Sequence, residues 1–558
     1  MSRARFVLVG VAWACDADPP APVDLPVVEC AGVEHVPGPS VVFDDRTVHQ
    51  LRLSLPAETR AALGAQTAAG DDTDYPAELQ LGAVTRDVGI RLKGSSTFQP
   101  LADKPNLKID VDAFVADQDL YGVEGFDLAN GTYDASAMKE HLAYRAFREA
   151  NLPASRTGWA QVWIDDVDYG LYTIVEQQNG DYLEQWWDDT TGSVYESEGG
   201  CDLVDLQLLS GGYGWELDRS GGGDTEADLW ALGAAAETSP DAWFDAIGRE
   251  VDWPVVARSL ALEAVIGHWD SYSGGVKNTR LYHEPTVDRW TYTPWSTDLA
   301  FASFGGPSGG PRCGAALHED PAEYTHGVLV ERCLADAACS ASLDQARAEM
   351  AAHLRCLDLP AEIDRVAALL RPFVGTSPKG GYTQAEFDAE VACLEAWLAD
   401  RPAAWGVGAA APFAPGPVIN ELLASNAAGI RDADGEADDW IELYNPGDQD
   451  LPLAGYRLGG DLDGHDATVL GSLTLPAGGF VVLWADGDAA AGPDHLGFAL
   501  DRDGEAIALY APDGAPLDRV RFRPQDTDVS AGRYPDGSQA LGAWSTGAPT
   551  PGSPNAGP

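Results

Sequence analysis

Apolar and polar residues alternate with a period of two in several stretches between residues 41 and 402, and this alternation predicts β-strands. Val88 to Val111 contains Val-Gly-Ile-Arg-Leu-Lys and then Leu-Lys-Ile-Asp-Val. Trp159 to Val175 predicts two further strands joined by a turn over 165–170. In the second of the two motifs, Lys108 alternates with Leu107 and Ile109, so its side chain is expected on the opposite face of the strand.

Helical spacing follows the first strands and returns later in the same region. Residues 134–150 have apolar positions at helical intervals behind Asp134, a good N-cap residue. Segments rich in Ala and Leu from about 320 to 400 predict more helices. Residues 199–225 hold many glycines and predict an irregular insert. The region 41–402 is therefore expected to be one mixed α and β domain.

The pattern changes beyond a linker rich in Ala, Gly and Pro at 403–416. Residues 417–558 contain short strand-like runs separated by Gly and Asp turns, which is typical of an all-β sandwich. Before the first domain, residues 16–40 are rich in Pro and Asp and predict a tether.

The first 15 residues predict an export signal. A basic start precedes the apolar run Phe6 to Ala14, and this run is too short to span a membrane. Cys15 follows directly, so both ordinary signal cleavage and a lipid anchor at Cys15 fit the sequence. We therefore expect an extracytoplasmic protein, secreted, periplasmic or lipid-anchored at the cell envelope, without a transmembrane span.

Cysteine usage agrees with export. The eight cysteines form no CxxC pair and histidines are scarce, which favours disulfides over a structural zinc site. Cys333 and Cys339 could close a short local loop, but the full connectivity stays open.

The charge of the chain limits its partners. With 88 acidic and 35 basic residues the formal net charge is −53, so the surface as a whole repels nucleic acid and anionic membranes. An anionic ligand needs a local cationic cluster. Three of the six lysines, Lys93, Lys104 and Lys108, fall within sixteen residues and predict such a cluster.

Six ordered blocks in the first domain resemble the CotH (spore coat protein H) kinase family. They are Val88–Thr97, Lys104–Asp110, Asp134–Tyr144, Tyr169–Glu176, His268–Tyr282 and Pro294–Phe301. The resemblance implies an α+β, atypical kinase-like, two-lobed domain that uses ATP and Mg²⁺ (or Mn²⁺).

The resemblance also implies roles for individual residues. Lys104 and Lys108 would bind phosphate, and Asp270 would accept the proton of the acceptor hydroxyl. Asn278 and Asp298 would hold the metal, because Mg²⁺ prefers hard oxygen ligands.

Other residues have two interpretations. Glu176 would end the strand before a nucleotide-binding hinge, or it caps a turn. Glu140 would pair with a strand lysine, or it lies solvated at the surface, while Lys93 is expected to support the Gly-Ser-Ser turn. The chain departs from the family in having Ser296 where a second acidic residue is common, which puts a second metal contact in doubt.

The second domain is similar to the lamin-tail domain, an immunoglobulin-like sandwich. The supporting blocks are Val418–Glu421, Asp439–Asn445, Leu473–Pro476, Phe480–Trp484, Gly532-Arg533 and Thr550–Asn555. Trp440 is expected to anchor its core, with Ile441 and Leu443 on one strand face and Glu442 on the other. Asn420, Glu442 and Asn445 are expected to be turn and strand-end hydrogen-bonding residues.

Two functions fit these observations. The first is an exported ATP- and Mg²⁺-dependent protein kinase that phosphorylates Ser or Thr of secreted or surface proteins, with the sandwich as a tethering or recruitment module. The alternative is a non-catalytic surface or adhesion scaffold built on a degenerate kinase fold.

Overall fold

The computed structural model describes residues 34–36, 41–301, 324–405 and 416–555, with short gaps at 69, 188, 205, 211–212, 220–225, 358, 461–466, 523 and 539–543. The predicted export signal, Cys15 and most of the predicted tether lie outside these residues.

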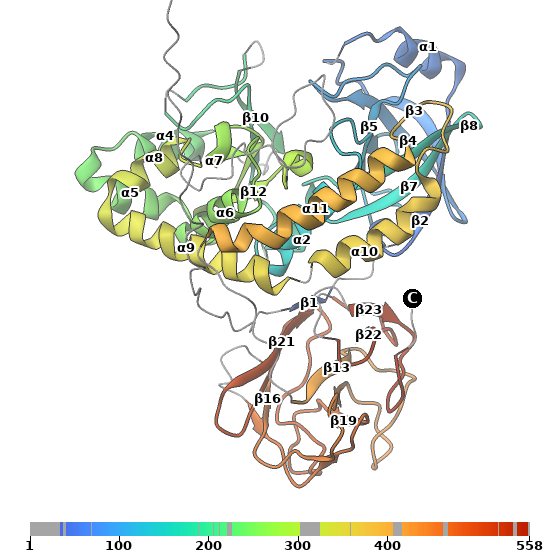
Figure 1. Cartoon of the computed structure of the whole chain (residues 1–558), viewed down its shortest axis with the longest axis vertical. Coiled ribbons are helices and arrows are strands. Elements are labelled where there is room, and N and C mark those ends of the chain that lie inside the picture. The colour runs from blue at the N-terminus through green and yellow to red at the C-terminus, as the bar shows by residue number, and fades with distance from the viewer. Residues whose placement is uncertain are drawn as a thin grey trace, which may run out of the picture.

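Seven strands of the first domain close into a barrel in the order β2-β3-β4-β5-β6-β8-β7 (Figure 1). Their bounds are β2 (Val48–Ser54), β3 (Tyr75–Leu81), β4 (Val84–Lys93), β5 (Asn106–Asp110), β6 (Gly125–Ala129), β7 (Thr157–Ile164) and β8 (Val167–Glu176), with helix α1 (Ala57–Ala65) between β2 and β3. The strands predicted from alternation are confirmed. Leu107 and Ile109 are fully buried in the barrel core, and Lys108 lies between them on the outer face.

Helix α2 lies between β6 and β7 in the sequence, and the later helices with a small sheet follow the barrel. The sheet has the order β10-β9-β11-β12, with β9 (Val194–Glu198), β10 (Gly214–Arg219), β11 (Thr279–Glu284) and β12 (Arg289–Pro294). The helices are α2 (Lys139–Glu149), α3 (Gly180–Glu184), α4 (Ala227–Ala236), α5 (Trp243–Glu250), α6 (Trp253–Val265), α7 (Tyr272–Gly275), α8 (Val328–Ala335), α9 (Ala337–Cys356), α10 (Leu359–Leu370) and α11 (Gln384–Ala404), with 3-10 turns η1 (Pro240–Ala242), η2 (Thr297–Leu299) and η4 (Arg371–Phe373). Strand β10 corrects the expectation of an irregular insert over 199–225, because it pairs with β9.

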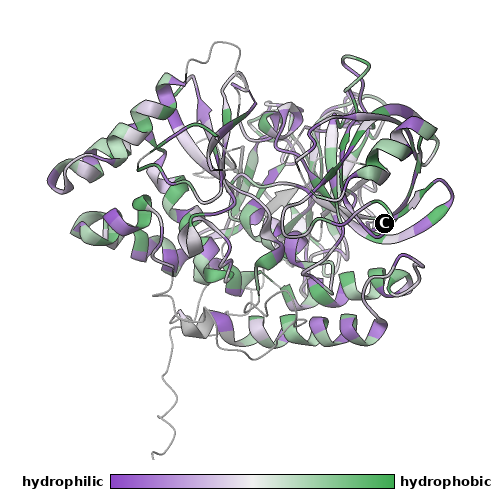
Figure 2. Cartoon of the chain, turned by 90° about the horizontal axis from the view of Figure 1, so that it is seen from above, coloured by the Kyte–Doolittle hydropathy of each residue, from purple (hydrophilic) through white to green (hydrophobic). Residues whose placement is uncertain are grey.

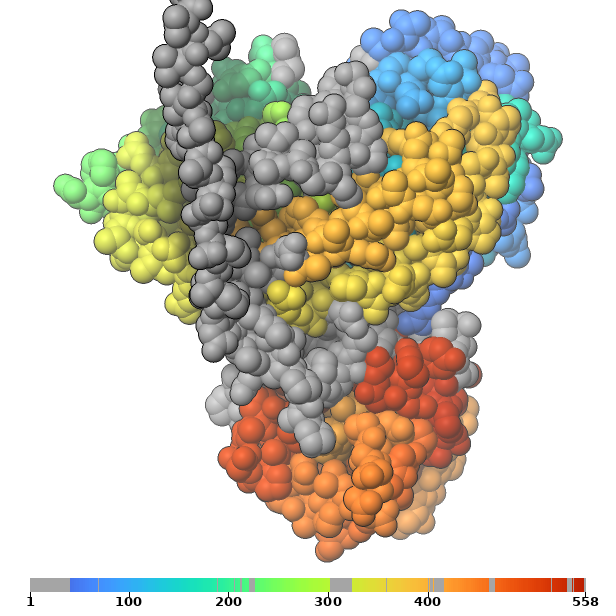
Figure 3. All heavy atoms as spheres, viewed as in Figure 1, coloured from blue at the N-terminus to red at the C-terminus, as the bar shows by residue number. Residues whose placement is uncertain are grey.

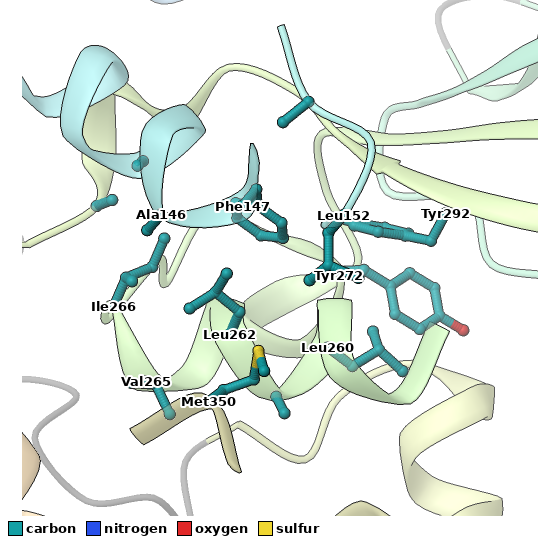
Figure 4. Packing of buried hydrophobic residues seen from close by; sticks show 14 of the residues in the cluster. Ala146, Phe147, Leu152, Leu260, Leu262, Val265, Ile266, Tyr272, Tyr292 and Met350 are labelled. Carbon is teal, nitrogen blue, oxygen red and sulfur yellow. The ribbon is translucent and has the colours of Figure 1, made fainter. Parts of the chain in front are cut away.

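Helix α2 begins five residues later than predicted. Asp134 is not the N-cap residue, which is Met138, but its carboxylate accepts hydrogen bonds from the backbone N–H of Ser136 at 2.9 Å and of Lys139, the first residue of α2, at 2.8 Å. One face of α2 packs on α6 and α9, where Phe147 lies near Leu262 and Met350 in the largest core (Figure 4). Helix α2 therefore joins the barrel to the helical part.

The C-terminal domain is all β, with two five-stranded sheets in the orders β19-β14-β13-β22-β23 and β1-β21-β20-β16-β17 and the short pair β15-β18. The strands are β1 (Glu34–Val36), β13 (Val418–Leu423), β14 (Trp440–Tyr444), β15 (Leu451–Pro452), β16 (Arg457–Gly459), β17 (Thr468–Val469), β18 (Thr474–Leu475), β19 (Phe480–Trp484), β20 (Ala506–Tyr510), β21 (Pro516–Phe522), β22 (Ser530–Arg533) and β23 (Trp544–Gly547).

The two faces of β14 differ from the prediction in one respect. Ile441 and Leu443 enter the main core as expected. Trp440, however, belongs to a separate small cluster with Leu423 and Trp484. Because successive side chains of a strand point to opposite faces, Trp440 shares its face with Glu442.

Residues 34–36 correct the prediction of a simple tether. They form β1, which pairs in parallel with the edge strand β21 of the C-terminal domain, and Figure 1 shows it between the two domains. Nearby, the guanidinium of Arg46 donates a hydrogen bond to the backbone oxygen of Trp544. The chain segment before the first domain is thus part of a sheet of the last one. Figure 3 shows the C-terminal domain, coloured orange to red, below the first domain.

Two further expectations concern cysteines and membranes. The sulfur atoms of Cys333 and Cys339 are 2.09 Å apart, the length of a disulfide bond, and close the short loop between α8 and α9. Hydrophilic and hydrophobic positions alternate along the helices (Figure 2), and among the described ranges none is long and apolar enough to cross a bilayer.

Candidate functional site

The loop between α6 and β11 brings Asp270 and Asn278 into direct contact. The side-chain amide of Asn278 donates to the backbone oxygen of Asp270 at 2.6 Å and to its carboxylate at 3.0 Å. The ammonium of Lys277 lies 3.0 Å from the other carboxylate oxygen. The short helix α7 turns the chain back, and Val276 and Asn278 have positive φ angles of 53° and 48°. Such strained backbone persists only where the surrounding structure imposes it, and it is concentrated at functional sites.

A second loop, after β12, carries Asp298. Its carboxylate accepts a hydrogen bond from the Ser296 hydroxyl at 3.3 Å, and Ser296 has a φ of 49°. Burial, together with the negative charges of Asp134 and Asp270, raises the pKa of Asp298 to about 6. The charge of Asp270 acts on the Asp298 carboxylate, so the two loops lie close enough for these charges to interact.

His268 holds these two loops together. Its ring Nε2 donates to the backbone oxygen of Ser296 at 3.2 Å. Burial lowers the pKa of His268 to about 4, so the ring is neutral at physiological pH and serves as a fixed hydrogen-bond donor.

The outer face of the barrel contributes cations to the site. The ammonium of Lys93 forms an ion pair with Asp127 of β6 and lies 5.1 Å from the ring centre of Trp295, two residues before Thr297. Lys108 on β5 lies opposite Asp127 in the strand register. Lys93 was expected to support the Gly-Ser-Ser turn after β4, and the structure shows its ammonium in contact with Asp127 of β6 and over the Trp295 ring.

Glu140 of α2 faces the same site. Burial raises its pKa well above the ordinary value, and Asp298 adds the largest repulsion, while the positive charge of Lys93 acts in the opposite direction. Glu140 is thus only partly exposed and lies among ionised groups, and the alternative of a solvated surface glutamate does not hold.

Lys104 is held by backbone groups of the barrel. Its ammonium donates to the backbone oxygens of Asn130 at 2.9 Å and Leu171 at 2.7 Å, and it lies 4.8 Å from the ring centre of Tyr172. Burial lowers the pKa of Lys104 to about 8. Through these contacts Lys104 links the end of β6 to β8 and stabilises the barrel.

Glu176 ends β8 and is almost fully buried, with 1% of its surface exposed. Its carboxylate accepts hydrogen bonds from the backbone N–H of Arg156 at 2.8 Å, from the Arg156 guanidinium, and from the Gln185 amide at 2.6 Å. The structure therefore gives this carboxylate protein partners on both oxygens.

Two residues of the site were missed from the sequence. Asp127 lies between the core residues Phe126 and Leu128, and this alternation was the available signal for its place on the face of Lys108. Arg280 lies 3.8 Å above the Trp295 ring and pairs with Asp218 at 3.1 Å and with Glu196. No signal in a single sequence joins Arg280 to strands so far from it along the chain.

The oxygen groups of the site suit a hard divalent cation. Asn278 donates through its nitrogen, which leaves its amide oxygen available, and the hydrogen bonds of the Asp298 carboxylate in the described part of the chain come from Ser296 alone. Carboxylate and amide oxygens are the ligands that Mg²⁺ takes from proteins. The residues present therefore fit the metal that the resemblance implies.

Comparisons with known proteins agree with this organisation. The family described as "CotH kinase protein" matches residues 90–405, more than half of the chain, and the "Lamin Tail Domain" matches residues 414–523. A search of curated proteins found no match. The matched region contains Asp270, Asn278 and Asp298. The chain belongs to the CotH kinase protein family and carries a lamin tail domain behind its first domain.

Proposed function

We propose that the protein is an ATP- and Mg²⁺-dependent protein kinase acting on Ser or Thr of exported proteins. The observation that carries the proposal is the contact of Asp270 with Asn278, next to Asp298 and opposite the cations of the barrel. Phosphoryl transfer needs these three elements: a group that orients the hydroxyl, oxygen ligands for metal, and positive charge near phosphate.

Asp270 is suited to receive the acceptor hydroxyl. Its side chain is 19% exposed, so one part is open to a substrate while Lys277 and Asn278 fix its orientation. A carboxylate held in this way accepts the hydroxyl proton as the oxygen attacks the terminal phosphorus. The hydrogen bond from Asn278 keeps the carboxylate oriented before the substrate arrives.

Asn278 and Asp298 would hold Mg²⁺ or Mn²⁺, which would neutralise negative charge on the phosphate oxygens. Lys108 and Lys93 are the lysines we assign to phosphate, in place of Lys104, whose ammonium already donates to two backbone oxygens. This local positive charge offsets the net charge of −53 that otherwise repels a nucleotide.

The arrangement of the domain is consistent with two kinase-like lobes. The barrel supplies the lysines, the helical part supplies Asp270 and Asp298, and the chain crosses from one to the other directly after Glu176. We place the adenine against the backbone of this crossing, because the Glu176 carboxylate is occupied by Arg156 and Gln185.

We further propose that the protein works outside the cytoplasm, as its N-terminal sequence predicts, with secretion and a lipid anchor at Cys15 both compatible with that sequence. The alternative function, a non-catalytic scaffold, is favoured by Ser296, which stands where a second acidic residue is common in the family.

Nucleotide binding tests the proposal. A kinase should show a rise in melting temperature with ATP that requires Mg²⁺ and that is lost in Asp298→Ala. A scaffold should show no metal-dependent shift at millimolar ATP, and that result would overturn the proposed function.

A further inference from the structure

Helix α2 presents different residues to two parts of the protein at once. Glu140 and Tyr144, four residues apart, share one face of the helix. Helix α2 packs directly against the 3-10 turn η2, which carries Asp298. The buried hydroxyl of Tyr144 and the carboxylate of Glu140 both lie within the electrostatic influence of Asp298. The position of α2 is therefore linked directly to the loop that carries the proposed metal ligand.

An adjacent face of α2 is bound to helix α10. His141 and Arg145 are also four residues apart, and both contact the carboxylate of Glu362, at 2.7 Å each. Arg365, one turn further along α10, donates to both oxygens of the same carboxylate at 2.7 Å. Glu362 is 6% exposed, so these contacts are made in an environment with little water.

Helix α11 makes a second contact of the same kind. Lys139 at the start of α2 forms an ion pair of 2.6 Å with Glu390, and the two side chains are only 2% and 0% exposed. Tyr382, in the connection between α10 and α11, also donates to the backbone oxygen of Thr132 just before α2. The beginning of α2 is therefore fixed by charged and polar groups from the end of the domain.

We propose that helices α10 and α11 form a built-in clamp in which Glu362 and Glu390 are positioning residues: they hold α2, and through Tyr144 and Glu140 they set the place of the Asp298 loop. The inference rests on the proposed function for its catalytic consequence, but the clamp itself is a property of the fold. Removing one partner of a buried ion pair leaves the other charge uncompensated, so the neighbouring helix must move or admit water.

The test uses Glu390→Gln and Glu362→Gln in the full mature chain. Asp388→Asn is a matched control, because Asp388 lies on the same helix α11 but pairs with Arg371 at the surface, with 45% of its side chain exposed. Amide hydrogen exchange is measured for residues 139–149 and 294–301, with strand β3 as an internal reference. The clamp predicts at least tenfold faster exchange in both segments for the two Gln variants and wild-type exchange in the control.

Kinetics provide a second measurement. The clamp predicts that kcat/KM for phosphate transfer falls at least tenfold in Glu390→Gln and stays within twofold of the wild type in Asp388→Asn, because α2 and the Asp298 loop move only in the first variant. If the wild-type protein transfers no phosphate, the proposed function fails, and the exchange experiment still decides on the clamp.

The clamp is overturned if a folded Gln variant exchanges residues 294–301 at the wild-type rate, or if Asp388→Asn has the same effect as Glu390→Gln. If Glu390→Gln does not fold, the double variant Lys139→Met/Glu390→Met removes both charges and avoids an orphaned one. Because no charge is orphaned, it should fold and exchange residues 294–301 close to the wild-type rate, while Glu362→Gln exchanges them at least tenfold faster. Wild-type exchange there in Glu362→Gln would contradict the clamp.

Discussion

Replacing Glu442 of the C-terminal domain by Gln should change the pH dependence of that domain's stability. Glu442 lies on β14 with none of its surface exposed, and its carboxylate accepts hydrogen bonds from the backbone N–H of Gly552 and from Asn420. Burial raises the pKa of Glu442 from 4.5 to about 7, with a further contribution from the charge of Glu421. The expected role of Glu442 and Asn420 as hydrogen-bonding residues is confirmed.

The direction of the pH effect on stability follows from which state binds the Glu442 proton. Between pH 4.5 and 7 the folded domain keeps the Glu442 proton while the unfolded chain has lost it, so raising the pH favours unfolding. Above pH 7 both states are ionised and the loss is complete. A pKa difference of about 2.5 corresponds to about 3 kcal/mol, of which about 2.5 kcal/mol falls between pH 5 and 8.

The assay is amide hydrogen exchange of the slowest amides in β13 and β14, which reports the opening free energy of this domain alone. Between pH 5 and 8, the opening free energy of the domain should fall by about 2 to 3 kcal/mol less in Glu442→Gln than in the wild type. The exposed residue Glu436 offers a control, and Glu436→Gln should follow the wild type. Parallel pH curves for the wild type and Glu442→Gln would refute the reasoning.

Two further predictions separate functional from structural charges. Lys93→Met should raise KM for ATP at least tenfold. Lys104→Met should leave KM for ATP within twofold and lower the free energy of unfolding by about 1 to 3 kcal/mol, because two backbone oxygens lose their donor. Steady-state kinetics measure KM and thermal melting measures stability; equal effects of the two variants on KM would contradict the assignment. Arg533→Met should destabilise the C-terminal domain by about 3 to 5 kcal/mol, because the buried Asp518 carboxylate, which Arg533 contacts at 2.9 and 3.0 Å, loses its charged partner and keeps the backbone N–H of Ile419. Melting curves check this value, and a loss below about 1 kcal/mol would show that Asp518 finds another partner.

Strand predictions from the sequence succeeded where the alternation had a physical cause. Leu107 and Ile109 are inside the barrel because it is closed, and the same rule places Lys108 outside. The start of α2 was misjudged because the Asp134 carboxylate accepts from the first N–H of the helix, at Lys139, across an intervening turn in which it also accepts from Ser136. Local propensity cannot distinguish these two uses of one carboxylate.

The site was predictable only in part for a similar reason. Asp270 and Asn278 belong to one short loop, so the sequence alone could predict that they lie close together. The sequence favoured Lys104 and Lys108 over Lys93 as phosphate ligands, and only the closed barrel shows that Lys93 contacts Asp127 while the Lys104 ammonium donates to backbone oxygens. The pairing of residues 34–36 with β21 joins opposite ends of the chain, which no local pattern records.

The most direct test of the central claim is phosphate transfer from labelled ATP by the purified mature chain, with Mg²⁺ or Mn²⁺. Asp298→Ala serves as the inactive variant and Asp388→Ala as a control at the surface of α11. The account predicts label on the protein or on a Ser-rich acceptor with the wild type and with Asp388→Ala, and none with Asp298→Ala. Absence of transfer together with absence of metal-dependent ATP binding, or equal labelling by Asp298→Ala, would contradict it.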